Sequence, residues 1–559
     1  MISRSKLLLL SSAASIIAVT ATDRAVHAAD MPVIKANPVD YVERCTQYGN
    51  GWIRYPGTAY CIKLAAKTSF DVDTFGRKDA LVMQQDQSKD THYTQTLVRK
   101  EQEDAFGLIT NVNFGAQVRT QTSFGSLFSS AQFQFGQSSG LEGAQSSAPA
   151  KSLGPGDGVT FKNANAIYSA TVGFSWGPLG HISVGRSGSE FQYMSGGDWG
   201  SNSYQTGLQR TNHASYQWNS SGTNNDPVGW TLNISFEDPA GHGDNAPWGG
   251  TKSKGLDGTL AANGFGTIAV TRGPFRLPDI IPNIRWLDDE IGSAFAAFAV
   301  HSIDRQAVSS TPPGNFAIGG TCTNGTAGGV PVGISTFGNC TNGQVVHSMG
   351  WGNLYALHLN LPRTPGNAPF ARDYILTEFT FSNGAMQEGG FQPSKRVRGG
   401  GPPFTEGGLM TDDDDAIAIA TPGGIMLEKE KFASWNFEYK RYLTSCLDPD
   451  WCWNMHIMAG LGWITPGFIA QNTDWTKGGV GKYFGQGYEF GVHYGVAELN
   501  MEVEADVSWH QHRQDLAHDP GVGPTPLPLG LSPNGGTWEF HLTIARNFGG
   551  ALGKNLAGF

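Results

Sequence analysis

Glu498-Leu-Asn-Met-Glu-Val-Glu-Ala-Asp-Val-Ser-Trp-His510 alternates between polar and apolar side chains without a break. Successive side chains of a strand point to opposite faces, so this stretch predicts a strand with one apolar and one strongly polar face. In a soluble sheet the apolar face is buried. In an outer-membrane barrel it contacts lipid, and the polar face lines a wet lumen. The rest of the chain decides between these two arrangements.

The composition favours the barrel. Only 15% of the 559 residues are charged, whereas about 25% is usual for a soluble protein. The chain contains 75 glycines, and 11% of its residues are aromatic, which suits short strands, irregular loops and aromatic belts. The formal charge is −10, so no basic face is implied and nucleic acid is not an expected partner.

The first residues have the pattern of a secretory signal. Arg4 and Lys6 precede an apolar stretch, and Val26-His27-Ala28 ends in small residues suited to cleavage after Ala28 or Ala29. Cleavage removes three basic residues and one acid, which takes the formal charge from −10 to −12. No later apolar run reaches the length of about 18 residues that a membrane-spanning helix needs. An exported chain without such a helix belongs to the periplasm, the exterior or a barrel.

An exported chain meets an oxidising compartment, so its cysteines are candidates for disulfides. The six cysteines fall into three neighbouring pairs, and six cysteines allow about 15 connectivities. Clustering favours the pairs Cys45–Cys61, Cys322–Cys340 and Cys446–Cys452. Metal binding is the weaker interpretation, because the chain has no Cys-x-x-Cys motif and no adjacent histidine pair.

Alternating segments recur along the chain. Residues 61–71 predict a first strand, and 111–121 with 131–135 predict a hairpin around Ser123–Ser126. Further strands are expected at 160–174, 178–187, 212–220, 228–238, 264–273, 293–304, 350–361, 370–382, 431–443, 451–462, 484–496, 498–510 and 537–548. The total is about sixteen, an even number that puts both chain termini on the short-turn, periplasmic side of the barrel.

The connections alternate in length. Short turns are expected at 177–178, 362–367, 445–450 and 495–497, and long loops near 73–106, 137–158, 239–263, 305–348, 384–430, 463–483 and 511–536. Short turns at one end and long loops at the other are typical of a bacterial barrel. Residues 274–292 do not fit, because they should form a short turn yet contain three prolines. The expected organisation is a signal peptide at 1–29, an N-terminal periplasmic segment at 30–60 and a barrel at 61–559.

Four stretches carry a resemblance to a known family. They are Cys45-Thr-Gln-Tyr-Gly-Asn-Gly-Trp-Ile-Arg-Tyr-Pro-Gly-Thr-Ala-Tyr-Cys61, Arg119-Thr-Gln-Thr-Ser-Phe-Gly-Ser-Leu127, Gly180-His-Ile-Ser-Val-Gly-Arg186 and Gly229-Trp-Thr-Leu-Asn-Ile-Ser-Phe-Glu-Asp238. In this order they resemble the alphaproteobacterial outer-membrane porin family of general diffusion porins. The terminal Phe559, after an alternating strand, resembles the assembly signal of outer-membrane barrels.

The resemblance implies an all-β transmembrane antiparallel barrel whose third loop, Phe191–Thr211, folds into the pore and narrows it. The expected constriction residues are Arg119, Arg186, Glu190, Asp198 and Arg210. By parity Arg119 lies on a polar face, whereas Arg186 shares its parity with Ile182 and Val184 and faces lipid unless a bulge at Gly185 rotates the strand. Ordinary loop and interface charges are the alternative interpretation of these residues. The resemblance alone implies a homotrimer.

A row of acids is expected on the lumen wall. Its members are Glu489, Glu498, Glu502, Glu504 and Asp506. Because rings of one charge favour the opposite ion, the row predicts a weak preference for cations. Arg119 is the clearest opposing cation of the lumen.

Three other motifs have ordinary explanations. Gly173-Phe174-Ser175-Trp176-Gly177 matches the Gly-x-Ser-x-Gly nucleophile pattern, but a proline and another strand follow instead of a helix. The acidic run Asp412–Asp415 and the pair His510 and His512 could bind a metal, but a solvated loop and polar lumen residues explain them better. We therefore expect no catalytic residue, metal or cofactor.

The sequence thus predicts a porin of the outer membrane that passes small hydrophilic solutes and ions and is surrounded by outer-membrane lipid. Two alternatives remain from the residues. One is an outer-membrane barrel enzyme of the lipase kind, which needs a serine and a histidine on one outer face. The other is a secreted β-rich binding protein.

Overall fold

The computed structural model of the 559-residue chain describes the ranges 43–48, 51–54, 56–75, 79–85, 95–101, 106–140, 167–193, 210–221, 228–238, 257–259, 268–272, 277–308, 326–327, 330–331, 345–362, 372–385, 409–411, 416–421, 424–429, 431–443, 453–471, 474–496, 499–516 and 534–548. The chain divides into two units, Met1–Glu43 and Arg44–Phe559. The expected signal peptide lies outside the described residues. No helix in the described ranges is both long and apolar enough to cross a membrane.

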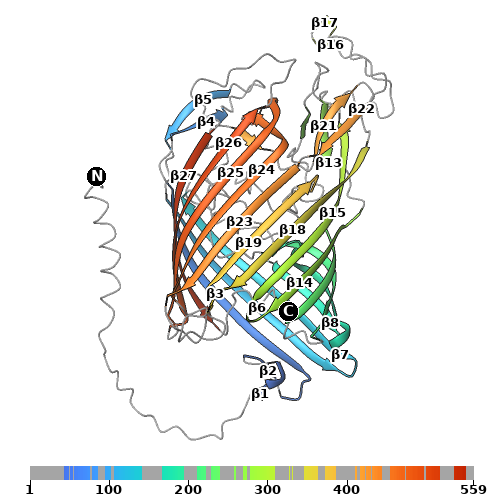
Figure 1. Cartoon of the computed structure of the whole chain (residues 1–559), viewed down its shortest axis with the longest axis vertical. Helices are drawn as coiled ribbons and strands as arrows, with labels where there is room; N and C mark the ends of the chain where they lie inside the picture. Colours follow the sequence, from blue (N-terminus) through green and yellow to red (C-terminus); the bar gives the residue numbers. More distant parts are fainter. Residues whose placement is uncertain are drawn as a thin grey trace, which may run out of the picture. The chain divides into compact units, whose positions relative to one another are not determined.

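The second unit is a closed antiparallel β-barrel of 16 strands (Figure 1). In chain order the ring strands are β3 (Tyr60–Phe75), β6 (Phe106–Thr122), β7 (Gly125–Gly140), β8 (Ile167–Ser175), β9 (His181–Gly188), β10 (Arg210–Asn219), β11 (Gly229–Glu237), β14 (Asp279–Asp288), β15 (Gly292–Val308), β18 (Val345–Asn360), β19 (Tyr374–Asn383), β23 (Lys431–Tyr442), β24 (Asn454–Gln471), β25 (Asp474–Val496), β26 (Met501–Leu516) and β27 (Asn534–Phe548). The last strand, β27, pairs with the first, β3, so the ring has no open edge. The predicted fold class is confirmed.

Short pieces accompany the ring. They are β1 (Glu43–Arg44), β2 (Ile53–Arg54), β4 (Asp79–Gln85), β5 (Gln95–Glu101), β12 (Asp257–Thr259), β13 (Ile268–Arg272), β16 (Thr326–Ala327), β17 (Val330–Pro331), β20 (Leu409–Thr411), β21 (Ala416–Thr421), β22 (Gly424–Lys429) and the 3₁₀ turns η2 (Thr46–Tyr48) and η3 (Gly177–Leu179). The predicted loop at 73–106 thus contains a hairpin, β4–β5.

The two faces of the ring strands differ in the way that alternation predicts. On β11 the inward-facing Thr231, Asn233, Ser235 and Glu237 are buried, whereas the outward-facing Trp230, Leu232, Ile234 and Phe236 are exposed. Glu237 is 0% exposed and Trp230 is 51% exposed. β26 repeats the pattern, with Asp506 and Ser508 buried and Val507 exposed. This is the reverse of a soluble sheet, whose apolar face is covered.

The connections between ring strands alternate in length as predicted with one exception: residues 472–473, between β24 and β25, are a short connection where a long one was expected. The other fourteen connections form two sets of seven. The short ones are 123–124, 176–180, 220–228, 289–291, 361–373, 443–453 and 497–500, and the long ones are 76–105, 141–166, 189–209, 238–278, 309–344, 384–430 and 517–533. The first ring strand begins at the short-turn end, where Tyr60 pairs with Thr120 of β6. The last ring strand, β27, ends there.

One predicted strand was misplaced. Part of 264–273 forms the short strand β13, which pairs with β15, but β14 is the ring strand between β11 and β15. Pro282 lies within β14, and it lacks the N–H that a ladder on both sides requires. The β14–β15 ladder passes over it, pairing Ile280 with Val300 and then Asn283 with Ala297. Pro282 therefore belongs to a strand and Pro278 to its approach, and the turn is only 289–291. Pro274 lies outside the described residues.

A second expectation also failed. Residues 463–483 do not form a long loop, because β24 and β25 continue as one hairpin with only residues 472–473 between them. The register shifts between Ile464 and Gly467, which is where Thr465 and Pro466 interrupt the alternation. A bulge absorbs such a residue and lets the strand go on.

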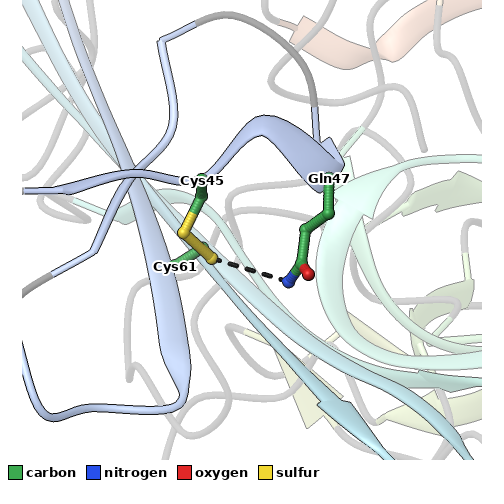
Figure 2. The surroundings of a disulfide bond; sticks show 3 residues. All are labelled: Cys45, Gln47 and Cys61. Carbon is green, nitrogen blue, oxygen red and sulfur yellow. Dashed lines mark hydrogen bonds between the residues drawn. A yellow bond between two sulfur atoms is a disulfide. The ribbon is translucent and has the colours of Figure 1, made fainter.

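The N-terminal segment is tied to the start of β3 by the Cys45–Cys61 disulfide (Figure 2). Short strand β2 pairs with β3 next to it, and the N–H of Cys45 donates to the carbonyl of Trp52. Gln47 Nε2 lies 3.7 Å from the Sγ of Cys61. The first of the three predicted pairs is confirmed. Cys322, Cys340, Cys446 and Cys452 lie outside the described residues, and their pairing stays a prediction.

Peptide mapping without reduction is expected to join the peptides of Cys45 and Cys61, because the structure places the two sulfurs in one bond. The same map tests the pairs Cys322–Cys340 and Cys446–Cys452, for which neighbouring positions in the chain are the motivation. Mapping after full reduction is the control. Free thiols at Cys45 and Cys61 in the assembled protein would contradict the structure.

Candidate functional site

The inner wall of the barrel carries most of the polar chemistry. Its described acids are Asp71, Glu237, Asp279, Glu378, Glu438, Glu489, Glu502, Glu504 and Asp506. Its described basic residues are Lys63, Lys67, Arg119, Arg285 and Lys440, and its histidines are His181, His213, His301, His358, His456, His493 and His541. Four of the five acids predicted for the lumen wall belong to this set. Glu498 lies outside the described residues.

Several wall acids contact bases on neighbouring strands. His456 Nε2 lies 3.2 Å from Glu489 Oε1, and both side chains are buried. Gly491 makes room for this pair, because a Cβ at that glycine would lie 2.1 Å from the Cε1 of His456. The sequence-based expectation of an acidic row with few opposing cations was therefore incomplete: the opposing groups are histidines and a lysine on β3, β24, β25 and β27.

Side chains also cross the seam where the ring closes. The Lys67 ammonium of β3 pairs with Glu502 of β26, although β27 lies between these two strands. Ala545 is the inward residue of β27 that is paired with Glu502, and its small side chain leaves space for the lysine. His493 Nε2 approaches the other oxygen of Glu502 at 3.7 Å.

A second chain of side-chain contacts crosses the same seam between β3 and β27, further along these strands than the Lys67–Glu502 pair. Asp506 Oδ2 lies 2.9 Å from His541 Nδ1, and Thr543 Oγ1 lies 3.0 Å from His541 Nε2. The Thr543 hydroxyl donates to Asp71 on β3 at 2.7 Å, and Asn111 on β6 donates to the other oxygen of Asp71. Four adjacent strands are thereby linked through their inward side chains.

The described start of the third loop, Ser189–Tyr193, folds against the inner wall. Phe191 is 2% exposed and packs in a cluster with the inward residues Ile281, Phe295, Ala297, Ala299, Leu354 and Ala356 of β14, β15 and β18. The aromatic ring of Phe191 also faces Gly352, where a Cβ would lie 3.3 Å from its Cζ. Burying one such aromatic side chain contributes about 1.5–3 kcal/mol. The loop therefore enters the barrel over an apolar part of the wall.

Polar contacts hold the same segment next to Phe191. The backbone N–H of Glu190 donates to Glu237 Oε1 at 2.8 Å. Asn283 Nδ2 donates to the carbonyl of Glu190 at 3.0 Å and lies 3.4 Å from its Oε2. Burial, and after it the neighbouring Glu237 carboxylate, raises the pKa of Glu190 to about 7, against the lowering effect of hydrogen bonds from Asn283 and Asn233.

Tyr193 continues the loop along the wall. Its ring centroid lies 5.1 Å from that of Phe295, and its hydroxyl is hydrogen-bonded to Ser293. The guanidinium of Arg285 lies over the ring, 5.9 Å from the centroid. A cation over a tyrosine face is attracted by the ring quadrupole. This arrangement combines an aromatic surface and a positive charge on the inner wall.

The predicted constriction residues are not gathered in one place. Arg119 faces inward as expected, but it lies near the short-turn end, over the rings of Tyr48 and Trp52. Arg186 pairs with Asn212 and Ala170 in registers that carry no shift, so it stays on the outward face of Ile182 and Val184. The bulge that would turn it inward is absent from these described ladders, and a constriction role does not fit this placement.

Of the other predicted constriction residues, the structure describes the side chain of one and not those of the other two. Glu190 lies at the root of the loop on the inner wall, and its constriction role stays a prediction. Arg210 begins β10, opposite Gly188, and the structure describes only its backbone. Asp198 lies outside the described residues. Constriction roles for Asp198 and Arg210 therefore stay predictions.

Residues on β14 were missed by the sequence reasoning. Asn283 and Arg285 contact the third loop, but the three nearby prolines hid their strand. The signal was present in the alternation of Asp279, Ile281, Asn283 and Arg285 with Ile280, Pro282, Ile284 and Trp286. Recognising Pro282 as a tolerated strand residue would have recovered both side chains.

The Gly-x-Ser-x-Gly motif has no nucleophile elbow. Ser175 ends β8, and the 3₁₀ turn η3 then leads directly into β9. The ring of Phe128 fills the space beside Gly173. Within the described ranges, no group of three His, Cys, Asp or Glu side chains is arranged to hold a metal ion. The run Asp412–Asp415 and the side chains of His510 and His512 lie outside those ranges.

Comparison with known protein families finds one match. A sequence model of the porin subfamily matches residues 30–267, a range that contains the disulfide segment, the third loop and β11. The match does not test the alphaproteobacterial attribution, which stays a prediction. No curated protein sequence matches the chain significantly.

Solved structures align with most of the chain at low identity. Pseudomonas putida OprB, in a structure at high pH, aligns with 87% of this chain and 94% of its own, at 9% identity and TM-score 0.42. Salmonella typhi OmpF with daunomycin covers 88% and 98%, at 10% identity and TM-score 0.36. An anion-selective porin from Comamonas acidovorans covers 88% and 100%, at 9% identity and TM-score 0.37.

Proposed function

Through residues 30–267 the chain belongs to the porin subfamily, and we propose that its barrel is a water-filled outer-membrane channel for the passive diffusion of small hydrophilic solutes and ions. The single observation that carries this proposal is the direction of the two strand faces. Apolar side chains such as Trp230 and Val507 are exposed outside the ring, and polar ones such as Asn233 and Asp506 face inward. A barrel in lipid with a wet lumen requires this arrangement.

Channel recording tests the proposal directly. Purified protein added to a planar lipid bilayer is expected to produce stepwise increases in current, because each inserted barrel offers one aqueous path through the hydrocarbon. Heat-unfolded protein in the same detergent is the control. Folded protein that inserts into lipid vesicles but never conducts would contradict the channel function.

The resemblance supports a homotrimer and lipid as the surroundings of the outward face. The step size of the recordings tests the first point, since three barrels inserted together give events in multiples of three. Crosslinking in detergent provides a second measurement of the assembly. A protein that is monomeric in both measurements would contradict the homotrimer but not the channel function.

A weak cation preference follows from the wall charges. The described inward acids outnumber the described inward lysines and arginines, although Glu489, Glu502 and Asp506 contact bases. Charges of one sign along a pore favour the opposite ion. We therefore expect reversal potentials in a salt gradient to show a weak preference for cations at low salt.

Two experiments check the selectivity prediction, a change of salt concentration and a pair of variants. Salt is expected to reduce the preference, because the Debye length falls from about 10 Å at 0.1 M to about 3 Å at 1 M. Glu504→Gln is expected to lower the preference, whereas Glu290→Gln, in the exposed 289–291 turn, leaves it unchanged. A clear preference for anions at low salt would contradict the prediction.

An outer-membrane barrel enzyme is the less supported alternative. Asp506, His541 and Thr543 are spaced like an acid, a base and a hydroxyl nucleophile. However, the Thr543 hydroxyl donates to Asp71 rather than to His541. A nucleophile also needs free backbone N–H donors for the oxyanion, and the local backbone belongs to paired β ladders. A secreted soluble protein is also less supported, because the apolar side chains exposed on the outer face of the ring would then be in contact with water.

A further inference from the structure

The N-terminal disulfide is attached to the inner side of the barrel wall. Cys61 is the second residue of β3 and shares its inward parity with Lys67, whose ammonium meets Glu502 inside the ring. Cys61 is 1% exposed, whereas the outward Tyr60 next to it is 41% exposed. Because Cys45 is bonded to the sulfur of an inward side chain, the chain around it lies over the inner wall and not outside the ring.

The chain around Cys45 forms a small folded unit on that wall, here called the mouth segment and defined as residues 45–48 with Trp52. The N–H of Cys45 donates to the carbonyl of Trp52 at 3.0 Å. Trp52 is buried together with the two cysteines, and the ring centroid of Tyr48, which packs against them, lies 5.4 Å from that of Trp52. β2, which follows, pairs with β3 beyond the point at which the β27 ladder ends. The mouth segment is therefore fixed at both of its ends.

Arg119 of β6 contacts the mouth segment from the neighbouring strand. It is the ladder partner of Cys61, so it faces inward as well. Its guanidinium lies 5.6 Å from the ring centroid of Tyr48 and 5.4 Å from that of Trp52. A cation over an aromatic face is attracted by the ring quadrupole, and a planar guanidinium also stacks on such a ring. The mouth segment thus has two side-chain attachments to the inner wall, the disulfide to β3 and Arg119 on β6.

Both side-chain attachments lie at the short-turn end of the barrel. Cys61 is one residue from the start of β3, and Arg119 is three residues from the end of β6, where the turn 123–124 follows. A folded segment on the inner wall at this end takes up part of the cross-section through which a solute must pass. The width of a pore and the polar groups that line it determine which solutes it admits.

We propose that the mouth segment is a second restriction of the channel, at its periplasmic end and separate from the third loop, and that Arg119 is a positioning residue for it. The inference rests on the proposed channel function, since its readouts are ionic current and solute flux. The solutes that it sorts are uncharged hydrophilic molecules such as sugars, and it sorts them by size. The covalent bond to β3 keeps the segment in place while solutes pass, and the exposed residues Thr46 and Gln47 border the opening.

Release of the mouth segment is the first test. The triple variant Cys45→Ser, Cys61→Ser, Arg119→Met loses both side-chain attachments. In liposome swelling, its rate with a trisaccharide relative to a monosaccharide is expected to be higher than that of wild type, and its single-channel conductance should be higher too. The double cysteine variant and Arg119→Met alone each keep one of the two attachments. Their conductance should therefore lie between those of wild type and the triple variant.

Two variants serve as controls for the release. Lys63→Met removes a cation from the same inward face of β3 without breaking either attachment, so the sugar size limit should stay that of wild type. Arg119→Lys keeps a cation near the two rings, but an ammonium does not stack on a ring as a guanidinium does. Its conductance should lie between those of wild type and Arg119→Met. A purely structural role of Arg119 would lower the yield of folded barrel without changing the current through each channel.

Charges placed on the intact mouth segment give a second test, which does not depend on release. The Gln47 side chain is exposed, and its Nε2 lies 3.7 Å from the Sγ of Cys61 (Figure 2). At about 0.1 M salt, where the Debye length is about 10 Å, Gln47→Glu should raise the preference for cations and Gln47→Lys should lower it. Glu290→Lys, in an exposed turn at the same end of the barrel, makes a larger charge change and should leave the preference unchanged.

The outcomes separate this inference from the channel proposal. A triple variant that migrates as a folded barrel but keeps the conductance and the sugar size limit of wild type would overturn the inference. Gln47 variants that leave the ion preference unchanged would overturn it as well. If the cysteine variants do not fold, Arg119→Met and the two Gln47 variants decide, because they keep the disulfide. A wild type that never conducts refutes the channel itself.

Discussion

Val507→Arg is expected to lower the free energy of unfolding of the barrel in lipid by about 2–4 kcal/mol, the value for a cation near the bilayer midplane on the lipid face. Val507 is 40% exposed on the outer side of β26, between Phe490 and Phe540 of the neighbouring strands. It lies six residues into β26 from Met501. At about 3.3 Å per residue and a tilt near 45°, that is roughly 14 Å along the membrane normal, about half of its thickness.

Val503→Arg is the matched control. Val503 has the same outward parity but lies only two residues into β26, close to the 497–500 turn. We expect a loss of about 0–1 kcal/mol there, as near a membrane interface. Urea unfolding in phospholipid vesicles measures both variants. Equal effects at the two positions would contradict a membrane-spanning β26.

The largest effect inside the barrel is expected at the seam. Removing the charge of Lys67 by Lys67→Met leaves Glu502 with only His493 as a described basic partner. Losing one partner of a fully buried ion pair costs about 3–5 kcal/mol. Lys67 and Glu502 retain 24% and 17% side-chain exposure, so we expect about 1–3 kcal/mol. Urea unfolding in detergent micelles is the measurement.

A double-mutant cycle separates the pair from other effects of each residue. Lys67→Met combined with Glu502→Gln should cost less than the sum of the two single changes, by about 1 kcal/mol. Lys63→Met, on the same face of β3 and nearer the short-turn end, is the control and should show no coupling to Glu502. Additive effects of the Lys67 and Glu502 changes would mean that this ion pair does not stabilise the seam.

Much of the barrel could be predicted from alternation, because many ring strands have one buried polar face and one exposed apolar face. β26 and β11 show this clearly. The failures have a common cause. Pro282 and Pro466 resemble loop residues, yet a ladder can pass over one proline or absorb it in a bulge. Local sequence patterns do not reveal which ladder positions tolerate such an interruption.

The inner wall was less predictable than the strands. Parity identified Glu489, Glu502, Glu504 and Asp506 as inward residues, but it did not reveal their partners. His456 meets Glu489 because β24 and β25 are neighbours and Gly491 leaves space for the ring. Lys67 meets Glu502 because the first and next-to-last strands are brought together when the ring closes. Both contacts depend on register and closure, which are properties of the whole fold.

The pairing of β3 with β27 also determines when this chain can finish folding. Thr543 and Asp71 contact each other across 472 residues of sequence, so this contact must wait for the last strand to be made and delivered. Contacts of such long range form slowly. In the meantime the partner edges of β3 and β26 are unpaired, and an open edge can pair with a strand from another molecule. A chain truncated before β27 should therefore be lost to aggregation rather than assemble as a leaky channel, and a periplasmic holding factor should matter most for this last step.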